Sequence, residues 1–260
     1  MSSPSARHAQ VARALTPLIG VQLDVVRLPR VVLAGFEPSQ VGTIVGTLVD
    51  ACVPALDQLY PNLEGLGLLK APGILGEREG YPDFHHSSGA RLELKMLYVD
   101  PVGVKMKVPP TPREPSARIT QKVTLKNVLP ERDLLFVLAY QLRPLPSERD
   151  TYSPTFVDIG LFPMIECVRA RDHRLTSRGG RWFGDYETPA VISAAGRRKL
   201  DNGRPLDASY GRKESEGKDY NEDTNFGKLK RVPYQALQAF LKKHGCDYMS
   251  GGDYPSPWSV

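Results

Sequence analysis

The segment Gly80–Asp100, which reads GYPDFHHSSGARLELKMLYVD, constrains the fold more than any other part of this 260-residue chain. Apolar and polar residues alternate on both sides of Ser87-Ser88-Gly89, as is typical of strands with one buried face. A three-residue hairpin loop needs one residue in the left-handed conformation, which glycine adopts without steric cost. We therefore predict two strands, Tyr81–His86 and Ala90–Val99, joined by a three-residue turn.

This turn determines which residues face one another. It places Asp83 opposite Glu93, and because strand side chains alternate, Lys95 shares their face. The opposite face takes apolar side chains only, namely Phe84, Leu92, Leu94 and Met96. A two-residue loop would shift the register and divide the two carboxylates between the faces, so the register is part of the prediction.

The rest of the chain indicates a mixed α/β fold, with a central β-sheet flanked by helices. A strand is expected at Arg118–Val128, and a buried central strand at Asp133–Leu142, which is continuously apolar (DLLFVLAYQL). Helices are expected at Pro38–Leu56, kinked or restarted at Pro54, at Pro163–Arg174 and at Val232–Gly245. Gly42 and Gly46, one turn apart, would let a neighbouring element approach the first of these helices. The segment Val108–Pro115 reads as an exposed excursion.

We find no break between two independent cores, so a single domain over residues 1–260 is predicted. Its catalytic core would span about residues 36–175, followed by a basic elaboration at about 176–231 and the closing helix at 232–245. Apolar residues make up 41% of the chain, which allows a sizeable core. No apolar run approaches the ~20 residues that span a bilayer, and no secretory signal is evident.

Three cysteines, Cys52, Cys167 and Cys246, are far apart and form no CxxC pair. They indicate neither a zinc site nor a disulfide framework. A soluble protein of a reducing cytoplasm, in a bacterium or archaeon, is expected.

The net charge of +5 lies entirely between Arg169 and Arg231, where 15 basic residues stand against 10 acidic ones. A basic region beside a neutral body suits a polyanion such as DNA, although a solvated loop-rich surface explains it as simply. Five residues of this region are the candidate phosphate or base contacts: Arg178, Arg181, Arg197, Arg198 and Lys199. Trp182 and Phe183 fit a small satellite core better than base stacking.

The polar face of the predicted hairpin carries the chemistry. Asp83 and Glu93 supply hard oxygen ligands for Mg²⁺, which binds through one or two carboxylates, water and substrate phosphate. Lys95 could orient or deprotonate a water, or stabilise charge that develops on a phosphate. The alternative is an ordinary hairpin whose charged side chains form exposed ion pairs of little energetic consequence.

Pro82-Asp83, nine intervening residues and Glu93-Leu94-Lys95 resemble the PD-(D/E)xK motif of nucleases. The resemblance covers about a tenth of the chain, and the pattern alone is loose. It implies that Asp83 and Glu93 are metal ligands, that Lys95 is the catalytic lysine, and that the fold has a restriction-endonuclease-like core with a C-terminal elaboration.

Members of this superfamily often add an acid from the helix before the motif, for which Asp50, Asp57 and Glu64 are candidates. Glu77 and Glu79 fit a loop role, and Gln121 and Lys122 are weak candidates for a further polar group after the motif. His85 shares the face of Asp83 and could contact a phosphate or a water. His86 points to the other face, which argues against a two-histidine metal site.

The sequence therefore favours a Mg²⁺-dependent, site-specific endonuclease of double-stranded DNA, most like a type II restriction enzyme. A homodimer is implied by the resemblance, since a palindromic duplex calls for a two-fold arrangement. The alternatives are a PD-(D/E)xK repair or junction-resolving nuclease, and a DNA-binding module without catalysis. No nucleotide cofactor motif is present.

Overall fold

The structure is a computed structural model that describes residues 4–52, 60, 63, 65–72, 81–99, 104–107, 117–119, 123, 125, 127–177 and 227–246. It divides into two compact units. Unit 1 comprises residues 1–117 and 131–162, and unit 2 comprises residues 118–130 and 163–260. The single-domain organisation expected from the sequence stays a prediction.

Unit 1 is built on a six-stranded mixed sheet whose strands lie in the order β1-β7-β6-β4-β3-β2. The strands are β1 (Leu28–Pro29), β2 (Leu68–Lys70), β3 (Phe84–His86), β4 (Arg91–Tyr98), β6 (Asp133–Pro144) and β7 (Thr151–Pro163). The pair β4–β6 is parallel, whereas β1–β7, β2–β3 and β3–β4 are antiparallel. The mixed α/β class and the central position of β6 are thus confirmed.

The predicted hairpin register is confirmed. Phe84 pairs with Leu92 and His85 with Arg91, as the three-residue turn requires. Gly89 has φ +82°, the left-handed conformation assigned to it. Its N–H donates to the His86 carbonyl (2.8 Å), and the His86 N–H donates to the Ala90 carbonyl (2.9 Å). β3 begins at Phe84, so the first strand is shorter than predicted.

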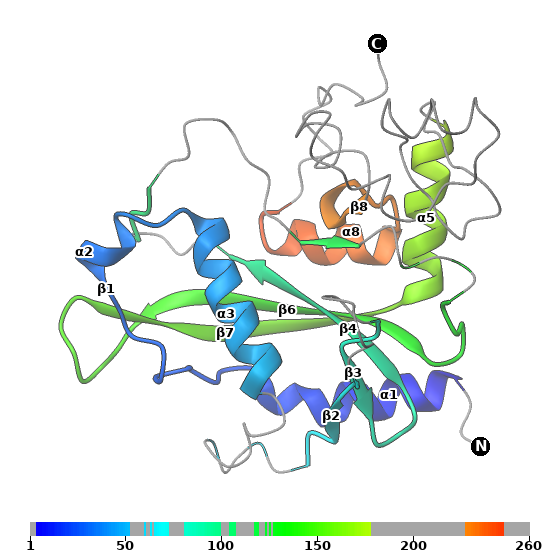
Figure 1. Cartoon of the computed structure of the whole chain (residues 1–260), viewed down its shortest axis with the longest axis horizontal. Coiled ribbons are helices and arrows are strands. Elements are labelled where there is room, and N and C mark those ends of the chain that lie inside the picture. Colours follow the sequence, from blue (N-terminus) through cyan, green and yellow to red (C-terminus); the bar gives the residue numbers. More distant parts are fainter. Residues whose placement is uncertain are drawn as a thin grey trace, which may run out of the picture. The chain divides into compact units, whose positions relative to one another are not determined.

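Helix α3 (Pro38–Cys52) packs on the apolar face of β4 and β6 and crosses these strands in Figure 1. A Cβ placed on Gly46 would lie 3.4 Å from Met96 Cγ, and one on Gly42 would lie 3.3 Å from the Tyr140 hydroxyl. The two glycines therefore allow the close approach expected from the sequence. Phe84, Leu92 and Leu94 belong to the same core, and Met96 packs against it.

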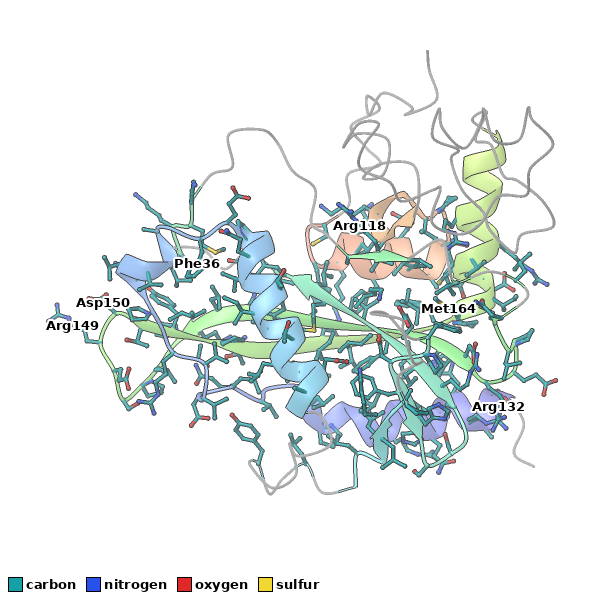
Figure 2. All side chains as sticks on the ribbon, viewed as in Figure 1. Phe36, Arg118, Arg132, Arg149, Asp150 and Met164 are labelled. Atoms are coloured by element: carbon teal, nitrogen blue, oxygen red, sulfur yellow. The ribbon has the colours of Figure 1, made fainter. Side chains whose placement is uncertain are left out.

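The N-terminal segment reaches from the β3–β4 turn, which α1 contacts, to the opposite edge of the sheet, where β1 pairs with β7. It contains α1 (Pro4–Leu15), the 3₁₀ turn η1 (Thr16–Leu18) and the short helix α2 (Arg30–Leu33). Arg7 of α1 donates from Nε to the Ser88 carbonyl (3.3 Å) and from Nη1 to the Glu131 carbonyl. Arg132, labelled in Figure 2, donates from Nε to the Gly89 carbonyl (3.0 Å). Two arginines thus bind the carbonyls of the hairpin turn.

Unit 2 contains α5 (Met164–Ser177), α8 (Gln235–Lys243), the 3₁₀ turn η5 (Leu229–Arg231) and a two-stranded sheet. That sheet pairs β5 (Arg118–Ile119) with β8 (Gly227–Lys228). Helix α5 confirms the helix predicted at Pro163–Arg174. The closing helix is also confirmed, and Gly245 follows it with φ +66°.

Two sequence interpretations need correction. The strand expected over Arg118–Val128 ends at Ile119 among the described residues, and it pairs with β8 rather than joining the main sheet. The longest strand among the described residues, β7, was not predicted. Within the described part of the chain, no helix has both the length and the apolar character needed to cross a membrane.

Candidate active site

Asp83 lies immediately before β3, where the hairpin ladder ends. Its carbonyl accepts the Ala71 N–H (3.0 Å), which ties this residue to the end of β2. The register places Leu94 opposite Pro82, beyond the first residue of β3. The Leu94 N–H instead donates to Asp83 Oδ2 (2.7 Å), so the carboxylate occupies the acceptor position of the missing strand partner.

Burial raises the pKa of Asp83. The positive charge of Lys95, the Leu94 N–H and the charge of Lys70 act in the opposite direction, and the negative charge of Asp50 adds to the increase. The net effect is that the ionised carboxylate is less favourable here than in water. A cation bound at Asp83 would relieve that penalty.

Glu93 and Lys95 lie on the face of β4 that carries no α3 contact. Lys95 Nζ donates to Glu93 Oε1 (2.7 Å). In the parallel register these residues neighbour Leu135 and Val137 of β6, both fully buried. The polar face of the hairpin therefore continues into an apolar strand.

The burial of this pair argues against the ordinary-hairpin alternative. The side chain of Glu93 is 6% exposed and that of Lys95 is 17% exposed. An exposed ion pair loses little hydration and stabilises a fold by about 0–1 kcal/mol. A buried pair carries a desolvation penalty that can exceed its attraction, so it is a poor choice if stability is its only role.

Of the three upstream acids predicted as candidates, Asp50 is the one that the described residues place near the site. It lies near the end of α3 and forms an ion pair with Lys70 of β2. Lys70 pairs in register with Phe84, next to Asp83, and its ammonium lies 4.7 Å from the Phe84 ring centroid. Asp57 and Glu64 lie outside the described residues, as do Glu77, Glu79, Gln121 and Lys122.

A second polar cluster adjoins the site and was missed by sequence reasoning. Arg91 donates from Nε to Asp133 Oδ1 (2.6 Å) and from Nη2 to Asp133 Oδ2 (2.5 Å). The Tyr81 hydroxyl donates to the same Oδ2 (2.5 Å). The available signal was an aspartate opening an otherwise apolar buried strand, because a buried carboxylate needs partners.

The tandem histidines point to opposite faces, as predicted. His85 is exposed and His86 is 4% exposed. The His86 Nδ1 accepts the Ser88 N–H (3.0 Å) and lies 2.7 Å from the Ser88 hydroxyl. Burial lowers the pKa of His86, so it holds the hairpin turn in its neutral form.

The donor set of the site fits Mg²⁺ in one particular way. Among the described residues, no group of three or more His, Cys, Asp or Glu side chains is arranged to hold a metal ion. Lys95 acts on the carboxylates of both Asp83 and Glu93, and Mg²⁺ is often held by one or two carboxylates while water and substrate phosphate complete its coordination. The residues present thus fit an ion shared with a phosphate substrate better than one enclosed by protein.

The candidate DNA contacts Arg178, Arg181, Arg197, Arg198 and Lys199 lie outside the described residues, together with Trp182 and Phe183. No family model matches the chain, and neither a curated protein nor a solved structure matches it.

Proposed function

We propose that this protein is a Mg²⁺-dependent endonuclease that hydrolyses phosphodiester bonds of double-stranded DNA, with Asp83, Glu93 and Lys95 as its active site. One observation carries the proposal. Lys95 is hydrogen-bonded to Glu93 and acts electrostatically on Asp83, and Glu93 and Lys95 are largely withdrawn from solvent, which supports a shared site. A buried ion pair is a poor way to gain stability alone, and such pairs are expected where charge is kept for chemistry.

The roles follow from the chemistry of the groups. Asp83 and Glu93 would hold Mg²⁺, which when bound supplies charge neutralisation at the phosphate and a water of lowered pKa. Lys95, already hydrogen-bonded to Glu93, would orient or deprotonate the attacking water, or stabilise negative charge on the phosphate. Asp50 lies on α3, which packs on the sheet face opposite Glu93 and Lys95, and it is paired with Lys70, so the third acid stays unassigned.

We further propose that unit 1 has a restriction-endonuclease-like core, and the order of its elements supports this. The motif hairpin is followed in the sheet by the parallel neighbour β6, and α3 packs behind it. Cleavage at a specific palindrome by a homodimer, with the basic segment at about 176–231 contacting DNA, completes the proposed type II restriction activity.

The experiment is a digest of plasmid DNA with Mg²⁺ or with EDTA. We expect the wild type to produce discrete fragments with Mg²⁺ only, and the Asp83→Asn and Lys95→Met variants to leave the plasmid intact. Asp150→Asn is a matched control, because Asp150 lies at the β6–β7 turn, labelled in Figure 2, and its φ of +59° suits asparagine.

Each other outcome has a meaning. Cleavage at branched or damaged DNA without sequence preference would point to the repair or junction-resolving class. Binding without cleavage under any divalent metal would point to a DNA-binding module. Metal-dependent cutting that survives Asp83→Asn would refute the site assignment.

A further inference from the structure

The cluster of Tyr81, Arg91 and Asp133 joins three parts of the chain beside the proposed active site. Asp133 opens β6, and its side chain is 1% exposed. Its two oxygens accept three hydrogen bonds, two from Arg91 and one from the Tyr81 hydroxyl, at 2.5–2.6 Å. Hydrogen bonds to an ionised carboxylate are stronger than neutral ones, and a two-nitrogen contact from arginine also fixes direction.

Tyr81 is held at its ring as well as at its hydroxyl. The Arg91 guanidinium carbon lies 5.3 Å from the Tyr81 ring centroid, within the range of a cation–π contact. Arg91 thus contacts both the Asp133 carboxylate and the Tyr81 ring, which are themselves joined by the Tyr81 hydroxyl bond. The three side chains form a closed triangle in which none can turn without breaking two contacts.

This triangle is coupled to both carboxylates of the site. Tyr81 precedes Asp83 by two residues, and Arg91 precedes Glu93 by two residues on the same face of β4. Arg91 and Asp133 are register partners in the parallel pair β4–β6. The triangle therefore links the chain that enters at Asp83 to the strand that carries Glu93.

Asp83 lies one residue outside the β3–β4 ladder, so its link to β4 is through its side chain. The ladder of β3 begins one residue later, at Phe84. The Ala71 N–H holds its carbonyl and the Leu94 N–H holds its carboxylate, while Tyr81 lies two residues before it in the chain. The bond from the Leu94 N–H to Asp83 Oδ2 reports directly whether the carboxylate is in place.

We propose that Tyr81 is a positioning residue, whose hydroxyl bond to the Asp133–Arg91 pair holds the Asp83 carboxylate in register with Glu93 for binding a divalent cation. The inference rests on the proposed function for the cation but not for the placement of Asp83. A purely stabilising role would not require this arrangement, since buried ion pairs can often be replaced by apolar side chains without loss of stability.

The test compares Tyr81→Phe, which removes only the hydroxyl, with Tyr60→Phe. Tyr60 is a matched control because its hydroxyl also donates to an aspartate, Asp24 Oδ1 (2.8 Å). The first readout is amide hydrogen exchange at Leu94 in the metal-free protein. The second is the dissociation constant for Mn²⁺, measured by electron paramagnetic resonance.

We expect Tyr81→Phe to accelerate exchange at Leu94 and to weaken Mn²⁺ binding by about tenfold, the lower end of the effect of losing a group that orients a metal ligand. Tyr60→Phe should change neither. Unchanged Leu94 exchange in Tyr81→Phe would overturn the proposal, as would an equal acceleration at all core amides, which indicates general destabilisation.

Failure of the proposed function would look different. If the wild type bound no Mn²⁺ while Tyr81→Phe still exposed the Leu94 amide selectively, the metal site would be wrong and the positioning of Asp83 by Tyr81 would stand. If the wild type bound Mn²⁺ and Tyr81→Phe bound it equally well, the positioning role would be wrong and the metal site would stand.

Discussion

The Arg91–Asp133 pair allows a quantitative prediction about stability. Replacing Arg91 by methionine keeps most of the side-chain volume and removes both of its bonds to a carboxylate that is 1% exposed. The Tyr81 hydroxyl then remains as a donor to Asp133. Breaking a buried ion pair from one side costs about 3–5 kcal/mol, because the remaining charge stays buried without the opposite charge that offset its desolvation.

The reverse substitution should cost less. Asp133→Leu leaves the Arg91 side chain, which is 19% exposed and can reach water with its guanidinium. We expect a loss of about 1–3 kcal/mol, the range for an unsatisfied polar group. The double variant, with an apolar pair in place of the ions, should be more stable than Arg91→Met alone, because no buried charge remains.

Denaturation by guanidinium chloride, followed by circular dichroism at the helix band, measures these free energies. Dichroism is preferred because both tryptophans, Trp182 and Trp258, lie outside the described residues. An Arg91→Met loss below about 1 kcal/mol, or a double variant no more stable than Arg91→Met, would refute the reasoning.

Three further predictions concern the hairpin and the site. Gly89→Ala should lower the free energy of unfolding by about 1–2 kcal/mol through backbone strain, because φ is +82° at this position. Steric contact is a smaller effect, since the added Cβ would meet only the Arg132 side chain, at 3.4 Å. Gly89→Asn should lose less free energy of unfolding in the same denaturation assay. Asp83→Asn should raise the denaturation midpoint at pH 7 in EDTA. Burial raises the pKa of Asp83, so the folded wild-type protein loses stability as pH rises through that pKa and the carboxylate ionises. His86→Asn should remove part of the acid sensitivity of the fold. Burial lowers the pKa of His86 below its usual value of about 6.5. The wild type therefore has its full stability above that pH and loses stability as pH falls through the folded-state pKa.

Each of these has a contradicting result. Equal losses for Gly89→Ala and Gly89→Asn would mean that backbone strain is not the cause. A lower midpoint for Asp83→Asn in EDTA would mean that the carboxylate stabilises the metal-free fold. For His86→Asn, a gap to the wild type that stays constant from pH 8 to pH 5 would remove histidine protonation from the account.

The hairpin could be predicted because its determinants are local. A glycine at the left-handed turn position and alternation on both sides fix the register without reference to the rest of the chain. Strand β6 was equally accessible, since a buried parallel strand is apolar throughout. The two glycines of α3, one turn apart, likewise predicted a close helix–strand contact.

Strand β7 could not be predicted from local pattern, because its sequence, TYSPTFVDIGLFP, contains proline, glycine and an acidic residue. Within it the Pro154 carbonyl accepts the Leu23 N–H (2.8 Å), and Ser153 donates to the Leu23 carbonyl. The strand is therefore held by tertiary pairing, with the N-terminal segment on one side and β6 on the other, and not by a local pattern. Helix α1 was missed because few of its residues, such as Val11 and Leu15, are buried apolar side chains.

The residues that contact the site could not be predicted, because they are far from their partners in the sequence. Arg91 and Asp133 are 42 positions apart, and their contact requires the parallel register of β4 and β6. The Asp50–Lys70 pair likewise requires the packing of α3 against the sheet edge. A motif can give the reactive side chains, whereas the groups that orient them depend on tertiary structure.

The central claim is that Asp83, Glu93 and Lys95 act together on a DNA phosphodiester with Mg²⁺. The most direct measurement is the single-turnover rate at which Glu93→Gln, an isosteric change, cleaves a DNA duplex that the wild type cuts. We predict a loss of at least about 100-fold, as expected when a preorganised electrostatic group at a reacting centre is removed, with Glu131→Gln cleaving at the wild-type rate. A Glu93→Gln rate within a few-fold of the wild type would contradict the account.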